Sequence, residues 1–150
     1  MGDCYSVTLY VKVAKGSKKN LAAIMRQWMR EEAKSTDGHL GVDWNLAEYR
    51  RCGIRPDSFS GICKVLLAFH QGDAQHLVDG EGFDLYTSGF NATYSWNRVM
   101  VDAFFKMAWA LEEGSYLEVD RDGGHDIYEV KHDGDDAEVW ENHRPPYHMR

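Results

Sequence analysis

The sequence has few of the residues that cross-link a chain or anchor it in a membrane. Its 150 residues include three cysteines and three prolines, and no apolar run approaches the roughly 18 residues that a membrane-spanning helix needs. Cys4, Cys52 and Cys63 are odd in number and lack framework spacing, which favours free thiols in a reducing compartment. The first residues also lack the basic and apolar regions of a signal peptide. We therefore expect a cytoplasmic protein that does not act in a membrane.

Signature motifs of common enzyme classes are absent as well. The sequence has no Gly-x-Ser-x-Gly elbow, no Walker loop and no Gly-x-Gly-x-x-Gly turn, which excludes the enzymes that these motifs mark. It also has no Cys-x₂-Cys or His-x₃-His pair. On a helix, Cys63 and His70 would lie about 10.5 Å apart along the axis, too far to share one zinc ion easily. We expect neither a metal nor a cofactor.

Residues 118–130 are the strongest candidate for a metal-binding loop, because Asp120, Asp122 and Asp126 surround a Gly-Gly pair. If Asp120 were position 1 of an EF-hand loop, position 6 should be glycine and position 12 glutamate. Those positions hold His125 and Lys131 instead. Asp-Gly-Gly suits a hairpin turn, since these residues tolerate positive φ. We prefer the turn, and a looser site of oxygen ligands is the alternative.

Charge is distributed unevenly along the chain. The net charge is −7, and residues 112–150 contain twelve of the 24 acidic residues but only four of the 17 basic ones. Basic residues are enriched between Lys12 and Lys34, where they could meet phosphates. Because overall negative charge opposes binding to nucleic acid, we interpret this stretch as a solvated helix face and expect no direct nucleic-acid binding.

Periodicity in the first half predicts one strand followed by helices. Residues 4–13 alternate as in a half-buried strand, with Tyr5, Val7, Leu9, Val11 and Val13 on one face and Ser6, Thr8, Tyr10 and Lys12 on the other. Apolar residues then recur at helical spacing, at Leu21, Ile24, Met25, Trp28 and Met29. Residues 43–51 fit a short helix. For residues 59–70 we prefer a helix over a buried strand, because Pro56-Asp57-Ser58 is a helix start signal.

The second half completes an α+β domain. Residues 72–82 fit a polar connector, and residues 83–94 fit a strand bulged at Gly89. Residues 96–112 fit a long helix that is buried on most sides, and residues 116–131 fit a hairpin. We expect a single-domain α+β fold with about four mostly antiparallel strands, the helix 96–112 packed on one face, and a C-terminal β-hairpin (116–131). A split β-α-β arrangement fits this order. Residues 1–132 would form the domain, and residues 133–150 an acidic, partly flexible tail.

This charge layout favours a non-enzymatic protein-interaction module. A row of carboxylates imitates phosphates and attracts a partner with a basic surface. Trp140 within that row is more apolar than a solvating tail requires. The expected binding residues are Asp133, Asp135, Asp136, Glu138, Trp140 and Glu141. An inhibitor or accessory factor of a nucleic-acid-handling protein, of the kind that mobile elements encode, would suit these features.

The alternative is a small enzyme. Arg50 and Arg51 adjoin Cys52, and neighbouring cations favour a reactive thiolate that a histidine could assist. A second possibility is an Asp/His site near residues 120–126. The two classes of function differ in one observable respect, because an enzyme needs its reactive groups to converge in a pocket.

Overall fold

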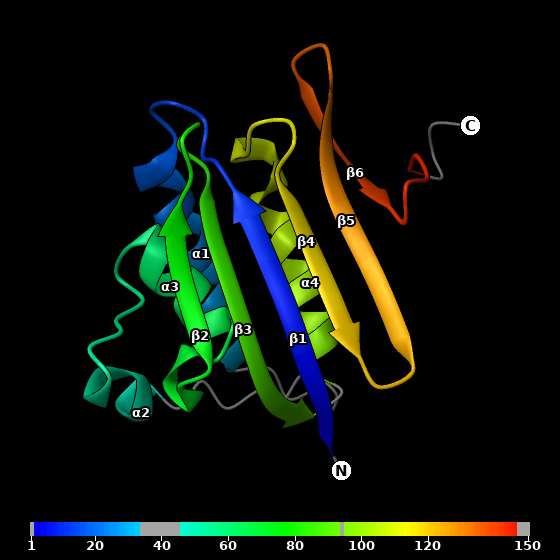
Figure 1. The fold of residues 1–150 in the computed structure, drawn as a ribbon. Helices are drawn as coiled ribbons and strands as arrows, with labels where there is room; N and C mark the ends of the chain where they lie inside the picture. The colour runs from blue at the N-terminus through cyan, green and yellow to red at the C-terminus, as the bar shows by residue number, and fades with distance from the viewer. Residues whose placement is uncertain (1, 34–45, 94, 147–150) are drawn as a thin grey trace.

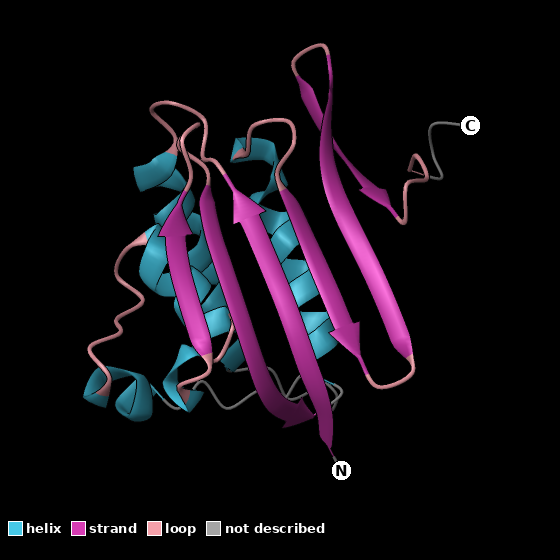
Figure 2. Cartoon of the chain, in the orientation of Figure 1, coloured by secondary structure: helices cyan, strands magenta, loops and turns pink. Residues whose placement is uncertain are grey.

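The computed structural model describes residues 2–33, 46–93 and 95–146. The described helices are α1 (Lys18–Ala33), α2 (Leu46–Arg51), α3 (Phe59–Leu66) and α4 (Ser95–Met107), with short 3₁₀ turns η2 (Phe69–Gln71) and η3 (Ala108–Ala110). The described strands are β1 (Gly2–Val11), β2 (Ala74–Val78), β3 (Asp84–Thr93), β4 (Tyr116–Arg121), β5 (Gly124–Asp133) and β6 (Asp136–Glu141). Helices and strands segregate into two layers (Figure 1, Figure 2).

The strands form one antiparallel sheet in the order β2-β3-β1-β4-β5-β6. The α1–α3 segment connects β1 to β2 with β3 lying between them, and α4 connects β3 to β4 with β1 lying between them. These two interleaved units form the split β-α-β arrangement. The helices lie behind the sheet in Figure 1, and none of the described helices covers the opposite face. We call that opposite side the helix-free face.

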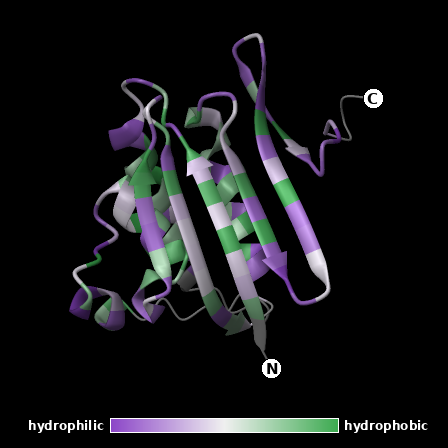
Figure 3. Cartoon of the chain, in the orientation of Figure 1, coloured by the Kyte–Doolittle hydropathy of each residue, from purple (hydrophilic) through white to green (hydrophobic). Residues whose placement is uncertain are grey.

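Strand β1 is the centre of the sheet and forms its main contact with the helices. It pairs with β3 on one side and β4 on the other. Its alternate residues Tyr5, Val7, Leu9 and Val11 are buried, while Ser6 between them is exposed. The hydropathy colours alternate along β1 in the same way (Figure 3). The predicted alternation in this strand is confirmed, and it determines which face the helices cover.

Helix α4 packs one side on the sheet, against β3 and β4, and also contacts α1. Its buried residues recur at helical spacing and are Val99, Met100, Ala103, Phe104 and Met107. The helix is shorter than the predicted 96–112, because the chain tightens into η3 after Met107. Phe105 and Trp109, expected inside, are 48% and 51% exposed. Burial on most sides was therefore wrong, since α4 belongs to an outer layer and only one of its sides meets the sheet.

Helix α3 confirms the preference for a helix over a strand in this region. The Ser58 hydroxyl accepts a hydrogen bond from the backbone N–H of Gly61 at 3.1 Å, which caps the first turn. The helix ends earlier than residue 70, because Ala68 adopts a left-handed conformation with φ of 53°. A Cβ on Gly61 would lie 1.8 Å from the carbonyl oxygen of Arg55, so this close approach of two backbone segments requires glycine.

The sheet has six strands rather than about four. Strand β2 lies inside the expected polar connector, and β6 lies inside the expected acidic tail. Each is an edge strand that pairs with one described neighbour. Backbone hydrogen bonds to that neighbour stabilise the strand, so its sequence needs few apolar residues and gives little signal. The expected bulge at Gly89 was also wrong, since Gly89 pairs one-to-one with Ser6. Asp43, the expected start of the short helix, lies outside the described residues.

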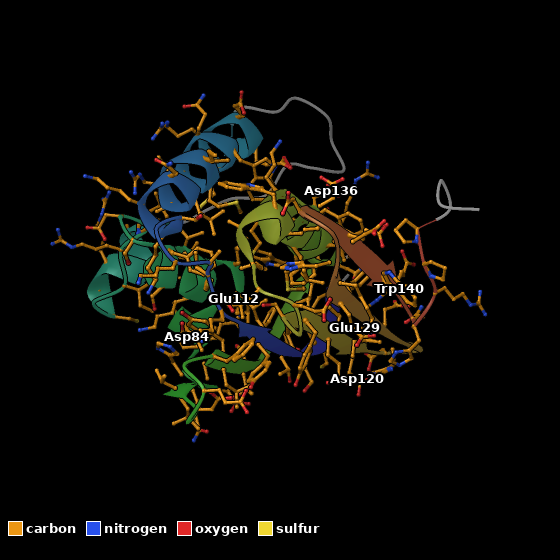
Figure 4. The ribbon with its side chains drawn as sticks, turned by 90° about the horizontal axis from the view of Figure 1, so that it is seen from above. Asp84, Glu112, Asp120, Glu129, Asp136 and Trp140 are labelled. Atoms are coloured by element: carbon orange, nitrogen blue, oxygen red, sulfur yellow. The ribbon has the colours of Figure 1, made fainter. Side chains whose placement is uncertain are left out.

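The C-terminal hairpin of residues 116–131 is confirmed as β4 and β5, joined by a two-residue turn in which Gly123 has a φ of 81°. Strand β6 then folds back on β5 and lies against η3. Ala137 and Val139 pack on the core from this strand. The β5–β6 pair therefore curls toward the helix side of the molecule, as the view from above shows (Figure 4). Within the described part of the chain, no helix is long and apolar enough to cross a bilayer.

The packing of α4 predicts a sharp difference between two of its side chains. Phe104 is 1% exposed, so Phe104→Ala should lower the free energy of unfolding by about 3–5 kcal/mol. Arg98 is exposed, and its guanidinium lies 3.8 Å from the carboxylate of Asp102, also exposed. Arg98→Ala should therefore change stability by less than about 0.5 kcal/mol. Urea denaturation measures both values, and similar losses would contradict the assigned faces.

Candidate functional site

A row of large side chains crosses the helix-free face from one edge of the sheet to the other. Strand register aligns one residue from each strand in this row, namely Leu77, Leu85, Tyr10, Tyr116, Glu129 and Trp140. Five of these six side chains are apolar or aromatic. We call this set the cross-strand row. Apolar surface on an open sheet face is unusual in a monomer and is typical of a binding surface.

Three aromatic rings form the middle of the row. Tyr10 and Phe83 stack with ring centroids 4.6 Å apart and planes 4° from parallel. Tyr116 lies on the other side of Tyr10, with centroids 5.3 Å apart. The ammonium group of Lys12 lies 5.7 Å from the centroid of Phe83. The rings are partly exposed, so this cluster offers a flat aromatic surface on which a cation or planar group can lie.

A hydrogen bond joins the aromatic cluster to the β2–β3 turn. The Tyr10 hydroxyl donates to the carboxylate of Asp79, which also accepts from the backbone N–H groups of Glu81 and Phe83 at 2.9 and 3.0 Å. The bond to Asp79 raises the pKa of Tyr10 to about 12. The same bond lowers the pKa of Asp79 below its usual range. Asp79 is therefore ionised at neutral pH, and it fixes both the turn and the ring.

Carboxylates also lie on this side of the sheet, in the row and next to it, and the curl of β5 and β6 separates Asp136 from Asp120 (Figure 4). By register, the strands place six of them there, against Lys12 and Lys131, and these are Glu118, Asp120, Glu129, Asp133, Asp136 and Glu138. Figure 4 shows Asp120 on the side of the sheet away from the helices. We call these six residues the acidic set. A surface with this excess of negative charge attracts cations over several ångströms.

One member of the acidic set is paired with a histidine. The Nε2 atom of His125 lies 2.7 Å from a carboxylate oxygen of Glu118, and both side chains are exposed. Hydrogen bonding to Glu118 raises the pKa of His125. Asp120 faces His125 across the hairpin. The face therefore becomes more negative above the pKa of His125, when the imidazole loses its charge.

The β5–β6 pair holds the six residues predicted to bind a partner, but the structure does not bring them all to one side. Asp133 pairs with Asp136, Glu138 with Lys131 and Trp140 with Glu129, all on the helix-free face. Asp135 lies in the connecting turn. Glu141 pairs with Tyr128 on the helix side. Four of the six predicted residues thus share one face.

The Trp140 ring already has a cation against it. The ammonium group of Lys131 lies 5.2 Å from the ring centroid. The indole N–H donates a long hydrogen bond of 3.4 Å to Glu138. Glu129, the neighbour of Trp140 across the strands, lies 2.7 Å from a ring nitrogen of His143. This end of the row combines an aromatic ring with carboxylates, the two groups that bind an arginine or lysine side chain.

The enzyme alternative rests on Cys52 with a histidine, or on an Asp/His site near residues 120–126. The thiol of Cys52 is exposed and lies 4.0 Å from the backbone carbonyl oxygen of His70. Cys63 is fully buried, and burial raises the pKa of its thiol. Asp126 accepts a hydrogen bond from the side chain of Asn142 at 3.0 Å, away from His125. Within the described ranges, no group of three potential ligands is placed to hold a metal ion.

A shallow polar hollow lies on the same face between β1, β2 and β3. Gly89 lies at its floor, and the carboxylate of Asp73 lies over Gly89, where a larger side chain would meet it. Ser6, Thr8, Gln75 and Thr87 also line the hollow. The hollow therefore offers hydroxyl, amide and carboxylate groups for hydrogen bonding.

Comparisons with known proteins found no matching family model, no matching curated protein and no matching solved structure.

Sequence reasoning missed the aromatic part of the site. It assigned Tyr10 to the polar face of its strand together with Ser6 and Thr8, and it treated Phe83 and Tyr116 only as strand residues. The signal that could have revealed the site was the aromatic ring at an outward position of the central strand. The rest depends on register, which brings residues 10, 83 and 116 together only when the sheet order is known.

The Tyr10–Asp79 bond gives a prediction about pH. A carboxylate whose pKa is lowered by folding stabilises the protein above its unfolded pKa, and this contribution is lost as pH falls through the folded pKa. Tyr10→Phe removes the main cause of that shift, so the pKa of Asp79 should rise toward its ordinary value. The stability difference from the unmodified protein should be largest near neutral pH and should shrink in acid.

NMR titration of the carboxyl carbons and denaturation at several pH values measure these two effects. Tyr116→Phe is the matched control, because that hydroxyl makes no hydrogen bond with Asp79. An Asp79 pKa that is the same in both variants would show that the hydroxyl does not hold the carboxylate.

Proposed function

We propose that this protein is a non-enzymatic interaction module that binds a basic segment of a partner protein on its helix-free face. One observation carries the proposal: register places the cross-strand row and the acidic set on the same, uncovered side of the sheet, which curves at β5 and β6. Aromatic rings supply contact area with little loss of side-chain entropy, and carboxylates supply attraction and register. The proposed site is centred on the β5–β6 pair, where Trp140 lies between Glu129 and Glu138.

The contacts within the site support a cationic partner group. Lys131 lies over Trp140 and beside Glu138, so a cation of the chain itself occupies the position that a partner arginine would take. Arginine is more weakly hydrated than lysine, and its planar group stacks on a ring while hydrogen-bonding to carboxylates. An arginine of the partner would displace Lys131 toward solvent and gain both interactions.

The same charges oppose nucleic acid as the ligand. Aromatic rings on an open sheet face can stack on bases, but binding of a nucleic-acid backbone needs cations along its path. Within the described strands, this face presents the acidic set against two basic residues, Lys12 and Lys131. A row of carboxylates resembles a row of phosphates to a basic surface. The proposed role is therefore an inhibitor or accessory factor of a nucleic-acid-handling protein, which competes for the basic surface of that protein in the cytoplasm.

Charge-neutralising variants test the proposal. The face variant combines Asp133→Asn, Asp136→Asn and Glu138→Gln. The control variant combines Glu31→Gln, Glu48→Gln and Asp102→Asn on the helix layer, so both variants have the same net charge. The probe is a 20-residue peptide of alternating arginine and serine, with a glutamate–serine peptide as the negative control. Surface plasmon resonance at low and high salt measures the rates.

The face variant should reduce the association rate about tenfold at low salt, because steering by a local field contributes about that much or more. The control variant should bind at nearly the unmodified rate, and salt should reduce the difference. Equal rates for both variants would mean that only net charge matters and that this face is not the site. Stability should change little, since exposed like charges contribute little to packing.

Trp140 should affect dissociation rather than association. Trp140→Ala removes the ring on which the cation lies, so the bound arginine peptide should dissociate several-fold faster while its association rate stays nearly unchanged. Trp109→Ala is the matched control, because Trp109 is exposed on the helix side. If both variants released the peptide at the same rate as the unmodified protein, the cation would not lie on the Trp140 ring.

A further inference from the structure

Strand β2 is an open edge of the sheet. Among the described residues its only strand neighbour is β3, and the two strands pair from Ala74 opposite Ser88 to Val78 opposite Asp84. Just beyond the strand ends, the Asp79 N–H donates to Phe83 at 3.0 Å, and the Gly89 N–H donates to Asp73 at 2.8 Å. In an antiparallel ladder the bonded pairs alternate, so odd-numbered residues of this strand bond to β3. The N–H and C=O groups of Ala74, His76 and Val78 therefore point outward.

The side chains at this edge are apolar rather than protective. Leu77 and Val78 are 57% and 64% exposed, the highest values among the exposed large hydrophobic residues of the described chain. Sheet edges are normally guarded by charges, prolines or bulges. The opposite edge, β6, has Asp136, Glu138 and Glu141 within the strand. Strand β2 has no charged residue between its ends.

The β2 edge is also held rigid before any partner arrives. On the helix side of the sheet, a ring nitrogen of His76 lies 2.9 Å from a carboxylate oxygen of Asp84. The imidazole also stacks on the ring of Tyr86, with centroids 4.2 Å apart. Tyr10 and the turn N–H groups hold Asp79 at one end of the strand. A template that is already ordered loses little entropy when a strand adds to it.

Asp73 and Asp79 flank β2, and their negative charges favour one kind of occupant. The Asp73 carboxylate lies over Gly89 and that of Asp79 is bonded to Tyr10 and the turn, so both act on an incoming strand by charge attraction. Pairing of β2 with a second copy, in the antiparallel register that uses all five residues, would place Asp73 of each copy opposite Asp79 of the other. Like charges directly opposite each other destabilise a strand pair. A strand with basic residues at those two positions would instead form favourable pairs. Charge complementarity therefore favours an extended basic segment over a second copy of this chain.

We propose that β2 binds an extended segment of a partner protein by antiparallel strand addition, with apolar residues opposite Leu77 and Val78 and basic residues opposite Asp73 and Asp79. Main-chain hydrogen bonds to Ala74, His76 and Val78 supply affinity, and the flanking charges supply register. This site lies at the opposite edge of the sheet from β6. It shares Leu77 with the cross-strand row, but it does not rest on the function proposed above.

The test uses a peptide with the core Arg-Val-Ile-Thr-Thr-Val-Arg, in which the central threonine falls opposite His76. Methylation of the central backbone nitrogen removes a bond to His76. Methylation of the preceding nitrogen is the matched control, because that group points away from β2. A third peptide has glutamate in place of both arginines. NMR titration of the full chain measures each affinity.

The parent peptide should bind, and central methylation should weaken binding at least about tenfold, whereas control methylation should change it less than about twofold. The glutamate peptide should also bind at least about tenfold more weakly. Binding should slow hydrogen exchange at Ala74, His76 and Val78. The proposal would be overturned if the parent peptide did not bind, or if the two methylated peptides bound equally well. Equal affinity of the arginine and glutamate peptides would also overturn it. So would slow hydrogen exchange at these amides in the free protein.

Two protein variants complete the test. Val78→Pro removes an outward N–H without removing a bond to β3, so it should abolish peptide binding while the melting temperature stays within a few degrees. The face variant of the previous section should bind this peptide normally, which separates the two sites. Sedimentation at rising concentration should show a monomer. A dimer that Val78→Pro dissociates would replace the proposed partner with a second copy.

Discussion

The pairing of β1 on both of its sides is the constraint on which the rest of the structure depends. Because β1 lies between β3 and β4, its alternating residues decide for the whole sheet which face is buried. Tyr5, Val7 and Leu9 direct that face toward the helices. The register then carries the pattern outward, so that Tyr10 on the other face aligns with side chains from five further strands. A one-residue slip of β1 would exchange the residues of the core and those of the helix-free face.

The helix-free face follows from how the helices are distributed. Both crossovers of the split arrangement lie on one side of the sheet, and the described helices leave the other side uncovered. The chain places aromatic rings and carboxylates there rather than a uniformly polar surface. In the function proposed above, this surface recognises a partner over an extended area rather than at a single point.

Sequence patterns predicted the parts of the fold whose signals are local. The alternation of β1, the Ser58 start signal of α3 and the Asp-Gly turn at residues 122–123 each involve neighbouring residues, and all three were predicted. Strands β2 and β6 were not predicted, because few of their residues are apolar. Pairing with β3 stabilises β2, and pairing with β5 stabilises β6. The acidic part of the candidate site was visible as composition. Its aromatic part was not, because rings from residues 10, 83 and 116 meet only through register.

The central position of β1 also has a consequence for synthesis on the ribosome. Gly2 pairs with Thr93 and Tyr10 with Tyr116, so β1 is synthesised well before both of its partner strands. At roughly 5–20 residues per second, β1 waits about 4–15 s for β3. During that interval both of its edges and its row of apolar side chains are unpaired. Nascent chains of this protein are therefore expected to need protection of β1 by a chaperone until β3 has been made.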